Sequence, residues 1–168
     1  MIQLRLKDAD ARTLVEVARA LVAAVEIPVI VNDRADVALA AGAAGVHVGP
    51  QDLPAAALRP WVPPGFIIGA SVGTEDELAC ARDADYVGIG PVFATDTKRD
   101  AGSSIGVDGF AALRSKLPQP AVAIGGITAK NAGAVMAAGA DGVAVIRAVF
   151  SAAAPGQAAQ LLRSAIGT

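Results

Sequence analysis

The chain has 168 residues, which is enough for a single domain, residues 1–168, with a substantial core. It is 54% hydrophobic and only 4% aromatic, so alanine, valine, isoleucine and leucine must form that core. A formal net charge of -2 gives no electrostatic reason to expect nucleic acid or a membrane surface as a partner, and a single cysteine excludes an intrachain disulfide framework.

The N-terminal stretch, MIQLRLKDAD, is charged from its fifth residue and does not have the pattern of a signal peptide. No apolar run reaches the roughly 18 residues that a membrane-spanning helix needs. We therefore expect a cytoplasmic protein without a membrane segment.

Seven short β-branched runs follow one another and are predicted to be strands. They are residues 2–7, 28–32, 45–49, 66–71, 86–93, 121–126 and 142–148. Alanine-rich stretches with helical spacing lie between them, for example residues 11–25 and 129–140. Strands that alternate with helices predict βαβ units and a parallel sheet.

Polar residues crowd at the C-terminal end of every predicted strand. They are Gln3, Arg5 and Lys7; Asn32 and Asp33; Gln51 and Asp52; Ser71; Thr95 to Arg99; Gly125 and Gly126; and Arg147. Active sites of (β/α)₈ barrels form at that face, whereas a doubly wound sheet uses two or three loops at one switch point. We therefore predict an α/β fold of the (β/α)₈ TIM-barrel type. Only about seven strand–helix units can be counted, so the N-terminal unit is expected to be missing.

Asp33 and Asp52 each follow a predicted strand by one to three residues. Two carboxylates near the mouth of a barrel suit Mg²⁺, which is usually held by one or two carboxylates plus substrate phosphates. Each aspartate also precedes a predicted helix, so an N-cap is an equally good interpretation.

Gln3, Arg5 and Lys7 have the i, i+2 spacing of one strand face. Burying them against an apolar helix layer would be costly, so we expect them to point into the polar end of the barrel. The alternative is a solvated edge strand.

The segment 94–106 is longer than the other loops and contains Thr95, Thr97 and Lys98. Long loops of this kind often act as lids, although a plain surface loop has the same composition. Gly125 and Gly126 precede a helix predicted to begin near Thr128, where free N–H groups could bind phosphate. A tight turn would also need these glycines.

His47 is the only histidine and lies between Val46 and Val48. No cysteine or aspartate has the spacing that would make it a metal ligand or the base of a nucleophile. We interpret it as a packed structural residue.

Five segments, in this order, resemble thiamine phosphate synthase: QLRLK, VNDRADVALAAGAAGVHVGPQDL, IIGAS, DYVGIGPVFATDTK and AIGGI. The resemblance extends from residue 2 to about residue 150. It implies a (β/α)₈ barrel and a Mg²⁺-dependent transferase. The implied reaction joins hydroxymethylpyrimidine diphosphate to a thiazole phosphate and releases pyrophosphate, so the expected partners are phosphorylated small molecules.

The resemblance also implies roles for individual residues, listed here in chain order. Gln3, Arg5 and Lys7 match the strand that holds the pyrimidine diphosphate, Asn32 matches a diphosphate or pyrimidine contact, and Asp33 and Asp52 match the magnesium ligands. Ser71 matches a serine near the pyrimidine and the leaving group. Thr95, Thr97 and Lys98 match the phosphate-binding loop, and Gly126 and Ile146 match the thiazole phosphate site. Arg5, Ser71 and Lys98 are the predicted catalytic residues.

Two departures from the family pattern are visible. The usual first strand and helix are not present before QLRLK, and Arg147 stands where a serine is usual. Two open sheet edges would invite pairing, so we expect a homo-oligomer in which a neighbouring chain covers the gap, or else an isolated chain of lower stability and weak activity. A related thiazole tautomerase uses a histidine where this chain has Gly73. A tautomerase-like isomerase and a non-catalytic paralogue that binds a phosphorylated ligand remain as alternatives.

Overall fold

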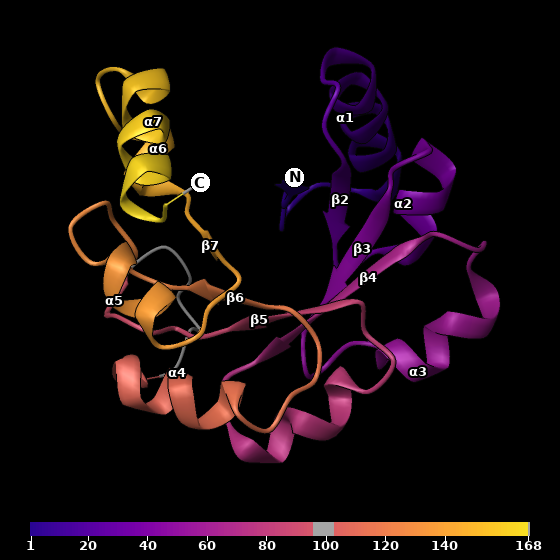
Figure 1. Cartoon of the computed structure of the whole chain (residues 1–168). Coiled ribbons are helices and arrows are strands. Elements are labelled where there is room, and N and C mark those ends of the chain that lie inside the picture. Colours follow the sequence, from indigo (N-terminus) through magenta and orange to yellow (C-terminus); the bar gives the residue numbers. More distant parts are fainter. Residues whose placement is uncertain (96–102, 168) are drawn as a thin grey trace. The chain divides into compact units, whose positions relative to one another are not determined.

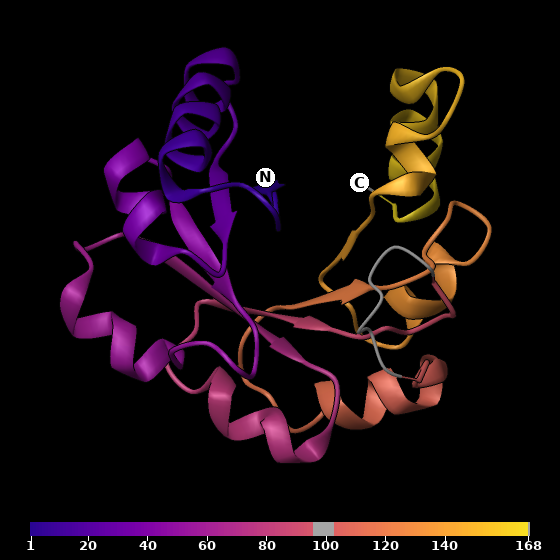
Figure 2. The same ribbon diagram turned by 180° about the vertical axis from the view of Figure 1, so that it is seen from behind.

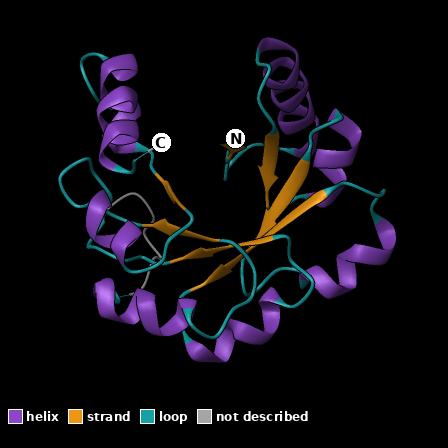
Figure 3. Cartoon of the chain, viewed as in Figure 1, coloured by secondary structure: helices purple, strands orange, loops and turns teal. Residues whose placement is uncertain are grey.

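Strands and helices alternate along the chain, of which this computed structural model describes residues 1–95 and 103–167 (Figure 3). The strands are β1 (Ile2–Leu4), β2 (Val29–Asn32), β3 (Gly45–Val48), β4 (Ile67–Val72), β5 (Tyr86–Ile89), β6 (Ala121–Ile124) and β7 (Gly142–Ala144). The α-helices are α1 (Ala11–Ala24), α2 (Ala35–Ala41), α3 (Ala55–Leu58), α4 (Gly106–Arg114), α5 (Ala132–Ala137), α6 (Arg147–Phe150) and α7 (Pro155–Ala165), with 3₁₀ helices η1 (Arg59–Trp61) and η2 (Glu75–Ala81). This order confirms the predicted α/β fold with about seven strand–helix units.

The chain divides into two compact units. Unit 1 comprises Met1–Ser71 and Ala79–Asp85, and unit 2 comprises Val72–Leu78 and Tyr86–Thr168. Strands β1 to β3 and nearly all of β4 belong to unit 1, and β5 to β7 belong to unit 2. That residues 1–168 form one domain stays a prediction.

Unit 1 is a parallel sheet covered by helices. Leu4 of β1 pairs with Val31 of β2, and Asn32 pairs with His47 of β3. Helices α1 and α2 pack against each other, as Figure 1 shows at the N-terminal end of the chain. Helix α1 begins after Asp10, whose carboxylate accepts hydrogen bonds from the Thr13 N–H and hydroxyl at 2.9 and 3.0 Å.

Unit 2 is built in the same way from β5, β6 and β7, which are parallel neighbours. Phe110 of α4 is the largest of the fully buried side chains in the described part of the chain. The C-terminal helices α6 and α7 contact each other, and Figure 2 shows them side by side. Within residues 1–95 and 103–167, no helix is both long and apolar enough to cross a lipid bilayer.

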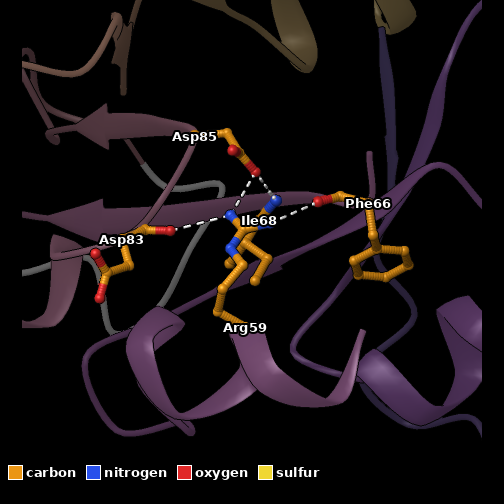
Figure 4. A network of polar contacts seen from close by, with 5 residues as sticks. All are labelled: Arg59, Phe66, Ile68, Asp83 and Asp85. Carbon is orange, nitrogen blue, oxygen red and sulfur yellow. Dashed lines mark hydrogen bonds and ion pairs between the residues drawn. The ribbon is translucent and has the colours of Figure 1, made fainter. Parts of the chain in front are cut away.

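An arginine–aspartate pair joins helix to strand near the N-terminal ends of the strands in each unit. Arg59 donates to the Phe66 and Asp83 carbonyl oxygens and to the Asp85 carboxylate, and that carboxylate also accepts from the buried Ile68 N–H (Figure 4). These contacts tie η1 to β4 and to the segment that precedes β5.

The second pair, in unit 2, repeats this arrangement. Arg114 of α4 donates to the Leu117 and Gly139 carbonyl oxygens and to Asp141, and the Asp141 carboxylate accepts from the Ala121 N–H at the start of β6. The same residue types occupy equivalent places in both units, so this arginine–aspartate arrangement recurs between strand–helix units.

Several predicted elements are shorter in the structure. Strand β1 ends at Leu4 rather than residue 7, because the chain turns at residues 7 and 8 to reach the Asp10 cap. Strand β7 ends at Ala144, and α6 begins at Arg147, inside the predicted strand 142–148. β-branched composition predicted where the strands lie, but a strand ends where its backbone groups no longer pair with those of the neighbouring strand.

Candidate active site

The C-terminal ends of β1 to β4 lie along one edge of the unit 1 sheet, because these strands are parallel. Arg5 follows β1 directly and is half-buried, and Lys7 is exposed in the next turn. The prediction that Gln3, Arg5 and Lys7 share one strand face is therefore wrong, since only Gln3 lies within β1. The two cations nevertheless remain at the predicted edge of the sheet.

Asp33 follows β2 in a left-handed backbone conformation, with φ of 63°. Its N–H donates to the His47 carbonyl oxygen at 2.8 Å, which extends the β2–β3 ladder by one residue. The N-cap of α2 is Arg34, not Asp33. Aspartate tolerates this conformation better than most residues, and the cap interpretation of Asp33 is not supported.

The residue after Asp33 has its own partner. Arg34 donates to both carboxylate oxygens of Asp36, from Nε at 2.8 Å and from Nη2 at 2.6 Å. This hydrogen bonding holds the pKa of Asp36 below its usual value and raises the pKa of Arg34. The pair joins the N-cap residue of α2 to the first turn of that helix.

Asp52 closes a turn after β3. The Gly49 N–H donates to Asp52 Oδ2 at 2.7 Å, and the Asp52 N–H donates to the Gly49 carbonyl oxygen at 3.2 Å. The N-cap of α3 is Pro54, so Asp52 does not occupy that position. The turn uses Oδ2 and orients the carboxylate at the end of β3.

Two carboxylates on neighbouring parallel strands have the donor chemistry that Mg²⁺ requires. Asp33 is exposed and Asp52 is partly exposed, so ligands can approach them. Mg²⁺ usually takes one or two carboxylates and completes its shell with water and substrate phosphate oxygens. In the part of the chain that the structure describes, no larger cluster of His, Cys, Asp or Glu forms a metal site. The residues present therefore fit a magnesium ion shared with a phosphorylated substrate.

Sequence reasoning missed the contact between His47 and Ser71. His47 is only 8% exposed, as expected of a packed residue, and its Nε2 lies 2.9 Å from Ser71 Oγ on β4. Ser71 is the predicted neighbour of the leaving group. The two residues are 24 positions apart and meet because β3 and β4 are adjacent, so no local motif could have shown the contact.

In unit 2, the segment that leads to Thr95 passes close to Gly126. Beyond β5, the Val92 and Phe93 N–H groups donate to the carbonyl oxygens of residues 124 and 125, which carries the chain alongside β6. A Cβ atom at position 126, where φ is 62°, would lie 2.6 Å from the Ala94 carbonyl oxygen. Glycine at 126 thus permits the close approach of the segment that leads to Thr95.

The loop after β6 differs from the expected helix start at Thr128. Helix α5 begins four residues later, at Ala132. The Thr128 N–H donates to Asn131 Oδ1 at 2.7 Å, and Asn131 Nδ2 donates to the Gly126 carbonyl oxygen at 3.0 Å. Because Asn131 accepts from the Thr128 N–H, a phosphate at this loop would have to use N–H groups nearer the glycines.

Two further predicted residues follow β7. Ile146 is half-exposed and precedes α6, and Arg147 is exposed at the first position of that helix. The structure thus places both at the C-terminal end of their strand, as predicted.

Thr97 and Lys98 lie outside the described residues, and their roles stay predictions. The two ends of the predicted lid segment are described. The Ile105 and Gly106 N–H groups donate to the Pro91 and Val92 carbonyl oxygens, both at 2.9 Å. The described residues on either side of the stretch 96–102 are therefore joined by backbone hydrogen bonds.

The predicted site residues divide between the two units. Those assigned to the metal and the pyrimidine diphosphate are all in unit 1: Gln3, Arg5, Lys7, Asn32, Asp33, Asp52 and Ser71. The described residues assigned to the phosphate loop and the thiazole phosphate are all in unit 2: Thr95, Gly126 and Ile146.

Comparison with known proteins gives a consistent result. The family model of thiamine monophosphate synthase matches residues 1–149. A thiamine-phosphate synthase of Azorhizobium caulinodans is 49% identical over 100% of this chain and 82% of its own length. One from Moorella thermoacetica is also 49% identical, over 98% of this chain and 81% of its own length. These matches confirm the resemblance found in the sequence.

Solved structures agree with the sequence matches. A thiamine phosphate pyrophosphorylase from Pyrococcus furiosus superposes with a TM-score of 0.82 at 39% identity, covering 98% of this chain and 81% of that one. A 3-hexulose-6-phosphate synthase superposes with a TM-score of 0.74 at 23% identity, over 99% of this chain and 87% of that one, which shows a shared fold alone. The predicted TIM-barrel-like fold is thereby confirmed. The chain belongs to the thiamine monophosphate synthase family and is an enzyme of the transferase class.

Proposed function

We propose that this protein is a Mg²⁺-dependent thiamine-phosphate synthase, which joins hydroxymethylpyrimidine diphosphate to a thiazole phosphate and releases pyrophosphate. The observation that carries the proposal is the 49% identity to curated synthases over the full chain. It is supported by the placement of cations and carboxylates at the C-terminal ends of β1, β2 and β3.

The residues of unit 1 suit the departure of a diphosphate. Arg5 and Lys7 bring positive charge to the end of β1, where it can neutralise the charge that develops on the leaving group. Arginine can bind phosphate oxygens with two parallel hydrogen bonds, whereas lysine acts as a point charge. Ser71 adds a hydroxyl donor at the end of β4.

Asp33 and Asp52 would hold the magnesium ion. When bound, Mg²⁺ supplies Lewis-acid stabilisation of diphosphate oxygens. The left-handed backbone at Asp33 and the turn at Asp52 hold the two carboxylates at the ends of β2 and β3. Neither residue has to transfer a proton in this mechanism.

The thiazole nitrogen is itself a nucleophile, and the electron-rich pyrimidine can stabilise positive charge on its methylene carbon. No general base is therefore needed, which agrees with a chain that has one histidine and one cysteine. Thr95, Gly126 and Ile146 are proposed to bind the thiazole phosphate, and Thr97 and Lys98 are proposed to bind phosphate oxygens. A homo-oligomeric state and a cytoplasmic location stay predictions.

The tautomerase alternative is weaker because of position 73. A Cβ atom there would lie 3.0 Å from the Gly90 carbonyl oxygen, and the Gly73 N–H donates to Glu77 Oε2 at 2.6 Å. A histidine at this position would require neighbouring backbone to move.

The proposal is tested by incubating the purified chain with both substrates and Mg²⁺ and measuring thiamine phosphate by chromatography. Product formation that disappears with a chelator and returns with Mg²⁺ is the expected result. Binding of the substrates without any product would instead support the non-catalytic paralogue.

A further inference from the structure

His47 contacts two predicted active-site residues of unit 1 through different atoms. Its carbonyl oxygen accepts the Asp33 N–H at 2.8 Å, and its Nε2 lies 2.9 Å from Ser71 Oγ. The residue therefore bridges the proposed metal ligand on β2 and the proposed substrate contact on β4. The first contact is made by the backbone and does not require a histidine, whereas the second requires the imidazole.

The sheet register explains how the imidazole reaches the serine. His47 pairs with Gly69 on β4, and Ser71 follows Gly69 by two residues. Side chains two residues apart lie on the same face of a strand. Because the paired residue Gly69 has no side chain, the nearest side chain on this face of β4 in the C-terminal direction is that of Ser71, which the imidazole contacts.

The direction of this hydrogen bond determines what Ser71 can do. A serine hydroxyl has one hydrogen to donate and two lone pairs. If His47 Nε2 carries a hydrogen, it donates to Ser71 Oγ, and the hydroxyl hydrogen stays available for an anionic substrate oxygen. If Nε2 accepts instead, the hydroxyl hydrogen is used within the protein and Ser71 can offer only lone pairs, which a phosphate oxygen does not need.

We propose that His47 is a positioning residue whose Nε2–H donates to Ser71 Oγ and directs the Ser71 hydroxyl hydrogen toward the departing diphosphate. This inference rests on the proposed function, because it requires Ser71 to contact the diphosphate of the pyrimidine substrate. His47 itself touches no reacting atom and transfers no proton.

The hydrogen bond can be tested without activity, because His47 is the only histidine in the sequence. Labelling an untagged chain with ¹⁵N-histidine gives ring signals from one residue, and long-range ¹H–¹⁵N spectra report which nitrogen carries hydrogen. We expect hydrogen on Nε2 and a change of the Nε2 signal in Ser71→Ala. The control Ser115→Ala, which removes an exposed hydroxyl at the end of α4, should leave the signal unchanged. Hydrogen on Nδ1 alone, or no response to Ser71→Ala, would overturn the proposal.

The role in catalysis is tested with a double-mutant cycle. His47→Phe, which keeps a ring but no hydrogen bond, should lower kcat by about tenfold to a hundredfold, the size of effect known for partners that orient metal-binding side chains, with little change in KM. The same substitution in Ser71→Ala should have almost no additional effect. His47→Gln keeps a donor of similar reach and should restore most of the loss.

Equal losses from His47→Phe in both backgrounds would show that His47 acts through packing and would overturn the proposal while the proposed function stands. Absence of product from the wild-type chain would overturn the proposed function and this inference together. Thermal unfolding of each variant identifies a variant that does not fold. If His47→Phe does not fold, His47→Gln and the spectra still decide the question.

Discussion

The two ends of the strands carry polar residues of different kinds. Near the N-terminal ends, Arg59 and Asp85 satisfy each other and the surrounding backbone, and Arg114 and Asp141 repeat the pattern. Beyond the C-terminal ends, Arg34 and Asp36 also form an ion pair, but Asp52 differs: it accepts one backbone N–H, and no described cation forms an ion pair with it.

This difference separates stability from function. Side chains that are paired with protein partners hold elements together, whereas a carboxylate that has no protein cation beside it is suited to bind a metal ion. In TIM-barrel enzymes the C-terminal face is catalytic and the opposite face stabilises the fold. Substitutions at one end should therefore change activity at constant stability, and substitutions at the other end should do the reverse.

The largest effect is expected from Asp52→Asn. The asparagine Oδ1 can still accept the Gly49 N–H, so the turn is kept while the charge is lost. Loss of a metal ligand should lower kcat/KM by on the order of a hundredfold or more. The melting temperature should stay within a few degrees. A variant that keeps full Mg²⁺-dependent activity would show that Asp52 is not a ligand.

Asp85→Ala should have the opposite effect. It removes the acceptor of the buried Ile68 N–H and one partner of Arg59. An unsatisfied buried donor costs about 1–3 kcal/mol of unfolding free energy, measured by denaturant titration. The activity of the folded fraction should be unchanged.

Asp85→Asn is the matched control, since it keeps an acceptor and removes only the charge. The ion-paired side chains are 35% exposed at Arg59 and 47% exposed at Asp85, so the charge itself should contribute at most about 1 kcal/mol. If Asn and Ala are equally destabilising, the ion pair matters more than the backbone hydrogen bond.

Two glycines with similar backbone angles provide a third test. At Gly42, which ends α2 before β3, φ is 70° and a Cβ atom would meet nothing within 4 Å, so Gly42→Ala should cost only the left-handed strain of about 1–2 kcal/mol. At Gly126, with φ of 62°, alanine would also press on the Ala94 carbonyl. Gly126→Ala should therefore be the more destabilising and should also raise the KM for the thiazole phosphate. Unchanged KM would remove Gly126 from the substrate site.

The smallest effect concerns Asp10, which lies beyond β1 but has a structural role. Its hydrogen bonds from Thr13 hold the pKa of Asp10 below its usual value. Such a group stabilises the fold above its unfolded-state pKa, and this contribution is lost as the pH falls through the folded-state pKa. Asp10→Ala should thus lower the melting temperature slightly at pH 7, and the difference should shrink in acid. A difference that does not change with pH would mean that the charge is irrelevant to the cap.

Sequence reasoning reached the fold and the family, because these depend on composition, order and short motifs, whereas the roles of the site residues stay predictions. It extended β1 to Lys7 because apolar and polar residues still alternate there, although the strand ends at Leu4. It also set the start of α5 at Thr128, where Asn131 instead forms a local turn. Helix and strand ends depend on such local competition for backbone groups.

Contacts between strands were the harder part to predict. His47 and Ser71, or Arg59 and Asp85, are each more than twenty residues apart and meet only because of the sheet register. Parallel strands are joined through helices, so no turn motif in the sequence sets their register. The hydrogen-bond partners of a buried histidine or a surface arginine therefore had to come from the structure.

The most direct measurement compares Asp52→Asn and Asp85→Ala in one experiment that records thiamine phosphate formation and denaturant unfolding for each. We expect Asp52→Asn to lose activity at nearly wild-type stability, and Asp85→Ala to lose stability with the activity of the folded protein intact. Loss of both properties in both variants, or the reverse pattern, would contradict the assignment of function to the C-terminal ends of the strands and of stability to the N-terminal ends.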